Sequence, residues 1–265
     1  MALSVLSLPS GLQPYRRFSI PIIVFFLLLL ILSMPARVLL SFVDITQFGI
    51  YAQGVSGPWY AASSQRVRVQ TPSLAVDLTN LKWRVKPLAS LRGRFMLALD
   101  AEFAQRPVQA VVGISVGGRV FVQHLHAAVP MQEFAPLMTR LTFPIDGQIN
   151  LQDVSLELHQ QWPVELRGKV LLTEVTLTLP IQLLDVGDVL LGLGMQDKDA
   201  VVAVIENDGQ LGLGGQLTLA ANHRFGLLLT STPSAQMSRE LRVQMQAMLG
   251  NPDKGKFSLR YDGAW

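Results

Sequence analysis

The amino-acid sequence predicts a mainly β protein with a minor α component. We expect a single N-terminal transmembrane helix, a long and curved antiparallel β-meander, one C-terminal helix and a final strand. Residues 18–34 form an uncharged apolar run. Beyond Thr46, apolar and polar residues alternate with a period of two in stretch after stretch, as in the half-buried strands of antiparallel sheets. Over residues 232–250, methionine and leucine recur at helical spacing.

The composition restricts the class of protein. Of the 265 residues, 49% are hydrophobic and 15% are charged, whereas about a quarter is charged in a typical soluble domain. The net charge is +3, and the basic residues are scattered among acidic ones, which argues against a nucleic-acid partner. Because the chain contains no cysteine, a disulfide framework, a thiol nucleophile and a cysteine-ligated metal are excluded.

The apolar run has the length of a membrane span. As a helix it would extend about 25 Å, close to the ~30 Å hydrocarbon core when Pro35 and Ala36 are added. Arg16 and Arg17 precede the run and no acidic residue lies before them, so we expect the N-terminus to be cytoplasmic. The alternatives are a cleaved signal peptide and a buried core helix. The cleavage site would be poor, however, and a core helix is rarely apolar all round.

This interpretation divides the chain into four segments. Residues 1–17 are a cytoplasmic tail, 18–36 the transmembrane helix, 37–50 a juxtamembrane segment that continues as an interfacial turn of helix, and 51–265 a β-rich domain on the far side. Trp83 followed by Gly93 is echoed by Trp162 followed by Gly168. The echo indicates either two related β units, about 51–128 and 141–265, or convergence between unrelated strands.

The alternating stretches place apolar residues on one face of each predicted strand. These residues are Val67 and Val69; Trp83 and Val85; Phe95, Leu97, Leu99 and Ala101; Val175, Leu177 and Leu179; Leu211, Leu213, Leu217 and Leu219; and Phe257, Leu259 and Tyr261. The tripeptide at 207–209 and the dipeptide at 146–147, both ending in Asp-Gly, predict hairpin turns. Phase slips at 152–153 and 173–174 predict β-bulges that curve the sheet.

Several local features complete the predicted fold. Gly93, Gly168 and Gly215 fit tight bends or bulges. Residues 131–140 and 181–191 fit short helical turns. The C-terminal helix should start at residues 232–233 and end at Gly250, where a left-handed conformation is wanted.

A search for chemistry finds no constellation with a defined geometry. His124 and His126 would share one face of a strand and could bind a metal together, but no third ligand has a matching spacing. Surface histidines are therefore the favoured interpretation. Asp100 and Glu102 are close in sequence, yet nothing orients them around a cleft. We predict no catalytic, cofactor or metal site, no small-molecule substrate and no enzymatic activity.

The order of short motifs resembles a known family. Met34-Pro35-Ala36 ends the anchor, and a G-V-S-G-x-W-x-x-A element follows at residues 54–62. An L-x-W-x-V-x-P-L…L-x-G element spans residues 81–93 and recurs loosely around Trp162 and Gly168. A G-x-L-x-L strand follows Gly209, and G-K-F-S-L-R-Y-D-G closes the chain. In this order and length the chain resembles protein N of the type II secretion system of Gram-negative bacteria. Tyr60 and Ser63 depart from the family pattern and put the local turn in doubt.

The resemblance implies an accessory inner-membrane component whose periplasmic domain acts through protein–protein contacts. The implied partners are other inner-membrane components of the secretion machinery and, as a second candidate, the outer-membrane secretin. The family pattern carries no catalytic residues. It marks structural residues, which are Gly54, Gly57, Trp59, Trp83, Gly93, Trp162, Gly168, Gly209, Gly250 and Gly255.

A second hypothesis belongs to a different class. An anchored, strongly apolar meander with bulges could form a trough that binds or transfers lipid. The simpler interpretation is that the same apolar residues fill a sheet-packing core. Aromatic residues at strand positions are usually core, so we expect Trp83 and Trp162 to be buried, while Trp59 and Trp265 are left open.

Overall fold

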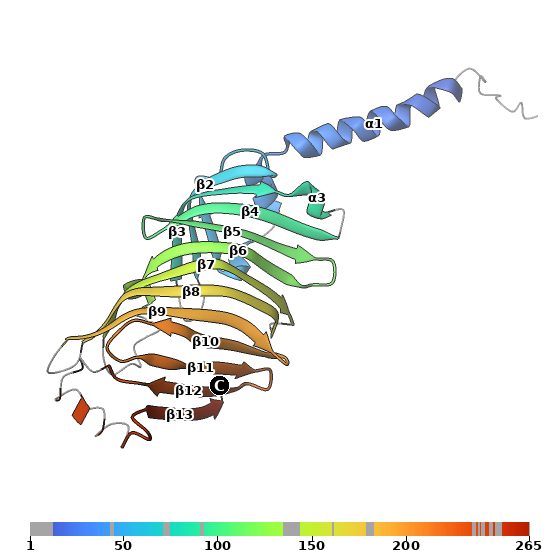
Figure 1. Cartoon of the computed structure of the whole chain (residues 1–265). Coiled ribbons are helices and arrows are strands. Elements are labelled where there is room, and N and C mark those ends of the chain that lie inside the picture. The colour runs from blue at the N-terminus through green and yellow to red at the C-terminus, as the bar shows by residue number, and fades with distance from the viewer. Residues whose placement is uncertain are drawn as a thin grey trace, which may run out of the picture.

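A computed structural model describes most of the chain. It covers residues 13–42, 45–70, 75–90, 93–134, 144–160, 162–178, 183–234, 237, 239, 242–243, 246 and 251–264, without the side chains of residues 13–20, 48 and 183. In this part of the chain, thirteen strands form one antiparallel sheet in which the strand order is the chain order (Figure 1). The predicted mainly β meander is confirmed. The strands are β1 Ile50–Gln53, β2 Ala61–Gln70, β3 Ala75–Val85, β4 Arg94–Phe103, β5 Arg106–Ser115, β6 Val120–Pro130, β7 Ile145–His159, β8 Trp162–Thr178, β9 Leu183–Gln196, β10 Asp199–Asn207, β11 Leu213–Ala220, β12 Arg224–Ser231 and β13 Phe257–Ala264.

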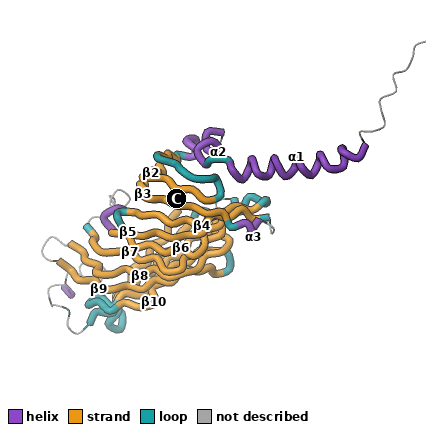
Figure 2. The backbone as a smooth tube through the Cα atoms, turned by 90° about the horizontal axis from the view of Figure 1, so that it is seen from above, coloured by secondary structure: helices purple, strands orange, loops and turns teal. Residues whose placement is uncertain are grey.

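Three of the described helical elements precede the first strand, and two lie between later strands. They are α1 Gln13–Ser33, α2 Ala36–Phe42, the 3₁₀ turn η2 Ile45–Phe48, α3 Pro87–Ser90 and the 3₁₀ turn η3 Met131–Phe134. Helix α1 projects away from the sheet next to β2 (Figures 1 and 2). It begins and ends earlier than the predicted span at 18–36, because the chain leaves the helix at Met34-Pro35 and re-enters one at Ala36. Helix α2 confirms the helical turn expected after the span.

The predicted membrane span is not confirmed. Over the residues that the structure describes, no helix has both the length and the hydropathy needed to cross a membrane.

The sheet has one apolar face and one polar face, as the alternation predicts. Cross-strand register aligns apolar residues from strand to strand: Trp83 lies opposite Leu99, and Val85 lies opposite Leu97. At the other end of the sheet, Leu217 lies opposite both Val202 and Leu227. Most of these side chains are half-buried, because the described residues provide no second layer over much of this face.

Fully buried side chains concentrate in two clusters. The larger lies at the C-terminal end of the sheet and contains Met131, Val175, Leu184, Val186, Val189, Leu211, Met237 and Phe257. The smaller contains Met96, Val111 and Phe121, with the Arg94 guanidinium 4.6 Å from the Phe121 ring centre. Its position corrects one expectation: on β4 the predicted wet side chain, Met96, is 5% exposed, whereas Phe95 is 43% exposed. Strand β4 therefore packs on both of its faces.

Both predicted bulges are present. The register of β7 and β8 shifts between Gln152 and Ser155, where Asp153 has φ 51°. The register of β8 and β9 shifts between Leu172 and Val175, where Glu174 has φ 53°. A phase slip in the sequence thus marks a residue that leaves the ladder. Such bulges bend a sheet, and the strands arch accordingly in Figure 1.

The turn predictions had mixed outcomes. The turn predicted at 207–209 lies where β10 ends and the β10–β11 connection begins, and a Cβ on Gly209 would lie 1.7 Å from the carbonyl oxygen of Val186. The turn predicted at 146–147 is wrong, because these residues lie inside β7, where the register shifts. Gly147 has φ 143°, and this glycine allows a bulge in the strand instead of a chain reversal.

Two helical predictions also need revision. The turn predicted at 181–191 is wrong, because residues from Leu183 onward belong to β9. The turn at 131–140 is present as η3 over its first residues, and its remainder lies outside the described residues. Most of the C-terminal helix predicted at 232–250, with Gly250, lies outside them as well. The final strand is confirmed as β13.

Candidate functional site

The end of α1 is tied to the sheet by the loop between β1 and β2. Trp59 uses two donors: its indole N–H donates to the carbonyl oxygen of Ile31 at 2.8 Å, and its backbone N–H donates to that of Met34 at 3.2 Å. In return, the Ala36 N–H donates to the carbonyl oxygen of Gly57 at 2.9 Å. The last carbonyls of a helix have no partner inside the helix. Here the loop supplies those partners.

A second indole connects this loop to the sheet. The Trp83 indole N–H donates to the carbonyl oxygen of Trp59 at 3.0 Å, and the Val85 N–H donates to that of Tyr60 at 2.7 Å. Both donor residues belong to β3. A continuous path of hydrogen bonds therefore runs from α1 through Trp59 to the third strand. We call this arrangement of Ile31, Met34, Ala36, Gly57, Trp59 and Trp83 the helix–sheet junction.

Gly57 has a conformation that the junction requires. Its φ is +98°, a region that side chains other than hydrogen disfavour. A Cβ on Gly57 would lie 2.9 Å from the carbonyl oxygen of Ala61 and 3.1 Å from the Cα of Ala62. Because both atoms are backbone, neither can move aside easily.

An apolar cavity of about 340 Å³ lies beside the junction, between α2 and the first strands. Ala36, Leu39 and Leu40 of α2 and Ile45 of η2 form one wall. The opposite wall consists of apolar side chains from the loop and β1–β4, which are Ile50, Ala52, Trp59, Val67, Leu81, Trp83, Phe95, Leu97 and Leu99. None of the described residues that line the cavity is charged, and both indole N–H groups are already used within the junction.

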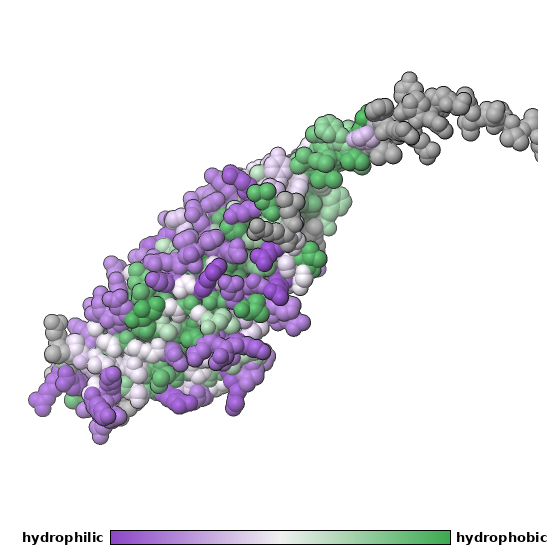
Figure 3. Space-filling view, turned by 45° about the vertical axis from the view of Figure 1, so that its right-hand side comes forward, coloured by the Kyte–Doolittle hydropathy of each residue, from purple (hydrophilic) through white to green (hydrophobic). Residues whose placement is uncertain are grey.

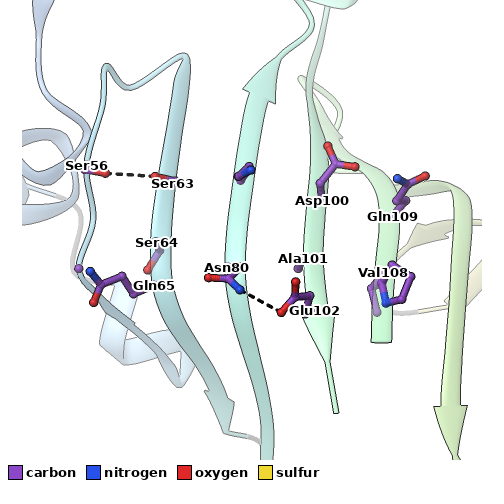
Figure 4. A pocket seen from close by; sticks show the side chains of 13 residues that line it. Ser56, Ser63, Ser64, Gln65, Asn80, Asp100, Ala101, Glu102, Val108 and Gln109 are labelled. Carbon is purple, nitrogen blue, oxygen red and sulfur yellow. Dashed lines mark hydrogen bonds between the residues drawn. The ribbon is translucent and has the colours of Figure 1, made fainter. Parts of the chain in front are cut away.

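A polar hollow occupies the opposite face of the same strands (Figure 4). It measures about 490 Å³ and includes Asp100 and Glu102, the carboxylates that sequence analysis left without a cleft. Asn80 donates a hydrogen bond to Glu102 Oε2 at 2.9 Å, and the Ser56 and Ser63 hydroxyl oxygens lie 3.1 Å apart (Figure 4). The lining residues include no histidine, so the hollow offers hydrogen-bonding groups without the usual general base at neutral pH.

The predicted histidine pair does meet a carboxylate. His124 Nδ1 lies 2.7 Å from Asp153 Oδ1, and the Asp153 N–H donates to His126 Nδ1 at 3.4 Å. The side chains of His124 and Asp153 are 64% and 65% exposed. Among the described residues no group of three potential ligands could hold a metal ion. These contacts accompany the bulges at His124 and Asp153, both of which have positive φ.

The remaining family-motif residues are dispersed along the sheet. Trp162 begins β8, and its indole donates to the carbonyl oxygen of Lys198 at 3.2 Å, whereas Gly168 lies within the same strand. Gly93 and Gly255 lie in turns before β4 and β13. Trp83 and Trp162 are both half-buried, less than expected. Gly250, Trp265 and the side chains of Arg16 and Arg17 lie outside the described part of the chain.

Sequence reasoning identified part of this site. The structure brings Gly54, Gly57, Trp59 and Trp83 to the junction or its adjoining loop, although the sequence separates the two tryptophans by a whole hairpin. Sequence reasoning did not identify the cavity wall formed by Ala36, Leu39 and Leu40. The apolar spacing of residues 36–40 could have indicated a buried helix face. The local sequence does not indicate which strands that face lies against.

A family model described as type II secretion system (T2SS), protein N, matches residues 49–260. The match runs from just before β1 into β13, so it covers β1–β12 and the first half of β13. The chain belongs to the type II secretion system protein N family. It therefore has a role in type II secretion, as a component of the cell envelope, and the predicted resemblance is confirmed. Searches among curated proteins and among solved structures gave no match.

Proposed function

We propose that this member of the protein N family is an accessory inner-membrane component of the type II secretion machinery. In this proposal α1 crosses the membrane once, the N-terminus is cytoplasmic, and the sheet stands in the periplasm. The sheet contacts other inner-membrane components through its open C-terminal edge, β13. Family membership together with this regular edge strand carries the proposal.

The character of α1 supports the membrane anchor. Residues 22–32 are all large and apolar, and each is between 43% and 65% exposed. A helix that is apolar all round must be surrounded by other apolar groups. Arg16 and Arg17 precede this stretch, which favours a cytoplasmic N-terminus. Trp59 and Gly57 would then hold the sheet at a defined position next to the membrane.

Strand β13 has the features of an edge that accepts another strand. All eight residues of Phe257–Ala264 pair with β12 without a register shift, and the strand contains no proline. Among the described residues, no strand pairs with its other side. Arg260 and Asp262 pair with each other at 3.1 Å, so these charges compensate one another. An edge without bulge, proline or net charge can take an extended partner segment by main-chain hydrogen bonding.

In-cell photo-crosslinking tests this proposal. A photoreactive amino acid is placed at Ser258 or Arg260 of β13, and at Lys169 in the middle of the sheet as an exposed strand control. We expect secretion components to be captured from β13 and not from position 169. Equal capture at both positions, or capture of unrelated envelope proteins alone, contradicts the edge contact.

Proline substitution provides a second test of the same contact. Of two neighbouring strand residues, one directs its N–H toward β12 and the other directs it outward. The two variants are Ser258→Pro and Leu259→Pro. The one that removes the outward N–H should keep its thermal stability but lose crosslinking and secretion. The other should be destabilised. Full secretion by a stable proline variant counts against strand addition at this edge.

A further inference from the structure

We infer that the apolar cavity beneath α2 holds an acyl chain of a membrane phospholipid. The inference rests on the proposed anchoring of α1. It goes beyond the proposed function because it assigns a ligand to a site on the apolar face, far from the β13 edge. Four properties of the cavity carry it: lining, size, position and continuity with the rest of that face.

The lining suits hydrocarbon and excludes polar ligands. Every described residue around the cavity is apolar, and among these residues the hydrogen-bonding side chains are those of Trp59 and Trp83. Their indole N–H groups donate to the carbonyl oxygens of Ile31 and Trp59, at 2.8 Å and 3.0 Å. A bound peptide would leave its own N–H and C=O groups without partners there, which is strongly unfavourable. An alkyl chain requires no such partners.

The size favours a slender ligand. The volume of about 340 Å³ falls at the lower end of the range of small-molecule sites. It is too small for a docked helix, whose diameter is about 10 Å with side chains. Because the cavity opens to solvent, water fills it when no ligand is bound, and its apolar walls offer that water no hydrogen-bond partner.

The position gives a lipid direct access. Ala36, which is 1% exposed, lies at the inner end of α2, only three residues after α1 ends at Ser33. If α1 lies in the bilayer, the cavity therefore lies at the membrane surface. Leu39 and Phe95 leave its rim partly exposed, which provides an opening. Figure 3 shows apolar side chains continuing from α1 onto the adjoining end of the domain.

The apolar face extends the cavity along the sheet. Leu97, which lines the cavity, lies opposite Val112 of β5, and Val112 lies opposite Val122 of β6. Val122 in turn lies opposite Leu156 of β7. All four side chains are half-buried. An acyl chain longer than the cavity would find apolar contacts along this row.

Photolabelling of the full-length protein tests the inference. The protein is reconstituted in vesicles of phosphatidylethanolamine and phosphatidylglycerol that contain a phospholipid with a photoreactive group near the end of one acyl chain. Labelled peptides are identified by mass spectrometry. We expect labels on Leu97 or Leu99 of β4, at the inner wall of the cavity, as well as on α1.

A cavity-filling variant provides the specificity control. In Leu99→Trp the larger ring occupies the cavity, and labelling of β4 should fall roughly tenfold, a change that a modest loss of affinity produces. Leu228→Trp is the matched control, because Leu228 is 42% exposed on the opposite face of β12. It should leave β4 labelling unchanged. Unchanged β4 labelling in folded Leu99→Trp overturns the inference, as does labelling confined to α1.

The same experiment separates this inference from the proposed function. If α1 does not enter the membrane, neither α1 nor β4 is labelled, and the anchor itself has failed. If α1 is labelled and β4 is not, only the acyl-chain site is wrong. Crosslinking from Ser258 serves as an independent check that Leu99→Trp is folded and still meets its partners.

Discussion

The indole N–H of Trp59 donates a 2.8 Å hydrogen bond to the carbonyl oxygen of Ile31, which joins the sheet to the last turn of α1. The two residues are 28 positions apart in the sequence. The backbone N–H of Trp59 makes a second bond to Met34. One residue thus fixes both the end of the helix and the direction in which the chain enters the sheet.

We expect Trp59→Phe to weaken this junction. The apolar cavity should change little in volume, because phenylalanine keeps most of the aromatic side chain. The lost hydrogen bond leaves the Ile31 carbonyl without its side-chain donor and should lower the unfolding free energy by about 1 kcal/mol. For a domain of this size the melting temperature should fall by roughly 2–4 °C. Thermal unfolding of the full-length protein in detergent measures the change. Tyr60→Phe is the matched control, and an equal loss in both variants contradicts a special role for the Trp59 indole.

Gly57→Ala should destabilise the protein for two separable reasons. The alanine must adopt φ +98°, which disfavours any side chain. Its Cβ would also clash with backbone atoms of Ala61 and Ala62. Gly118→Ala separates the two effects, because Gly118 has φ +73° but a Cβ added there would have no atom within 4 Å. We expect a loss of about 1–3 kcal/mol for Gly57→Ala and a smaller loss for Gly118→Ala. Denaturant unfolding gives both values, and the reverse order would show that the loop can relax.

The stability should depend on pH through Asp77. Hydrogen bonds from the Arg68 guanidinium, at 2.7 and 2.8 Å, hold the pKa of the Asp77 carboxyl below its usual value. A carboxyl with a lowered folded-state pKa stabilises the fold above its unfolded pKa of about 3.9, and this stabilisation is lost as the pH falls through the folded pKa. A double-mutant cycle with Arg68→Gln and Asp77→Asn should give a small favourable coupling at neutral pH, since both side chains are about half exposed. Coupling that does not fall as the Asp77 carboxyl becomes protonated, a step that NMR titration follows, is incompatible with this assignment.

Glu174→Gly should stabilise the protein, although glycine usually weakens a strand. Glu174 has φ 53° in its bulge, its side chain is exposed, and its backbone N–H donates to Asp188 Oδ1 at 2.9 Å. Glycine keeps that hydrogen bond and removes the cost of the left-handed conformation, which is about 1 kcal/mol or more. Lys169→Gly, at an exposed position of the same strand with ordinary φ, should instead destabilise by roughly 0.5–1 kcal/mol. Chemical denaturation measures the change in unfolding free energy of each variant. A destabilised Glu174→Gly would contradict the prediction.

The strands were predictable because their signal is local. A residue such as Val67 alternates with Arg66 and Arg68 whatever lies above it, and the pairing to β1 and β3 preserves that alternation. The bulges were predictable for the same reason, since an extra residue at Asp153 or Glu174 shifts the phase of the pattern. Local signals were therefore sufficient to predict strands and bulges wherever one face of the sheet is exposed to solvent.

Local signals gave wrong predictions in two situations. In one, both faces of a strand are buried. In the other, the same backbone conformation occurs in a bulge and in a turn. Strand β9 carries Leu184, Val186 and Val189 into a buried cluster and adds Leu190 and Leu191, so its spacing resembles a short helix. Asp-Gly at 146–147 indicates a positive φ, which serves a bulge as well as a turn. The apolar cavity was beyond prediction, because its walls come from α2 and four strands that are far apart in the sequence, and no window of sequence contains them all.

The meander has a consequence for how the protein can be made. In the described part of the chain, each strand pairs with its predecessor and its successor alone, so none of these strands must wait for a distant segment in order to pair. Chains dominated by near-neighbour contacts gain structure unit by unit. The helix–sheet junction, at the N-terminal end, would be complete as soon as β3 is available. The sheet can then be extended one hairpin at a time, in the order in which the chain is synthesised.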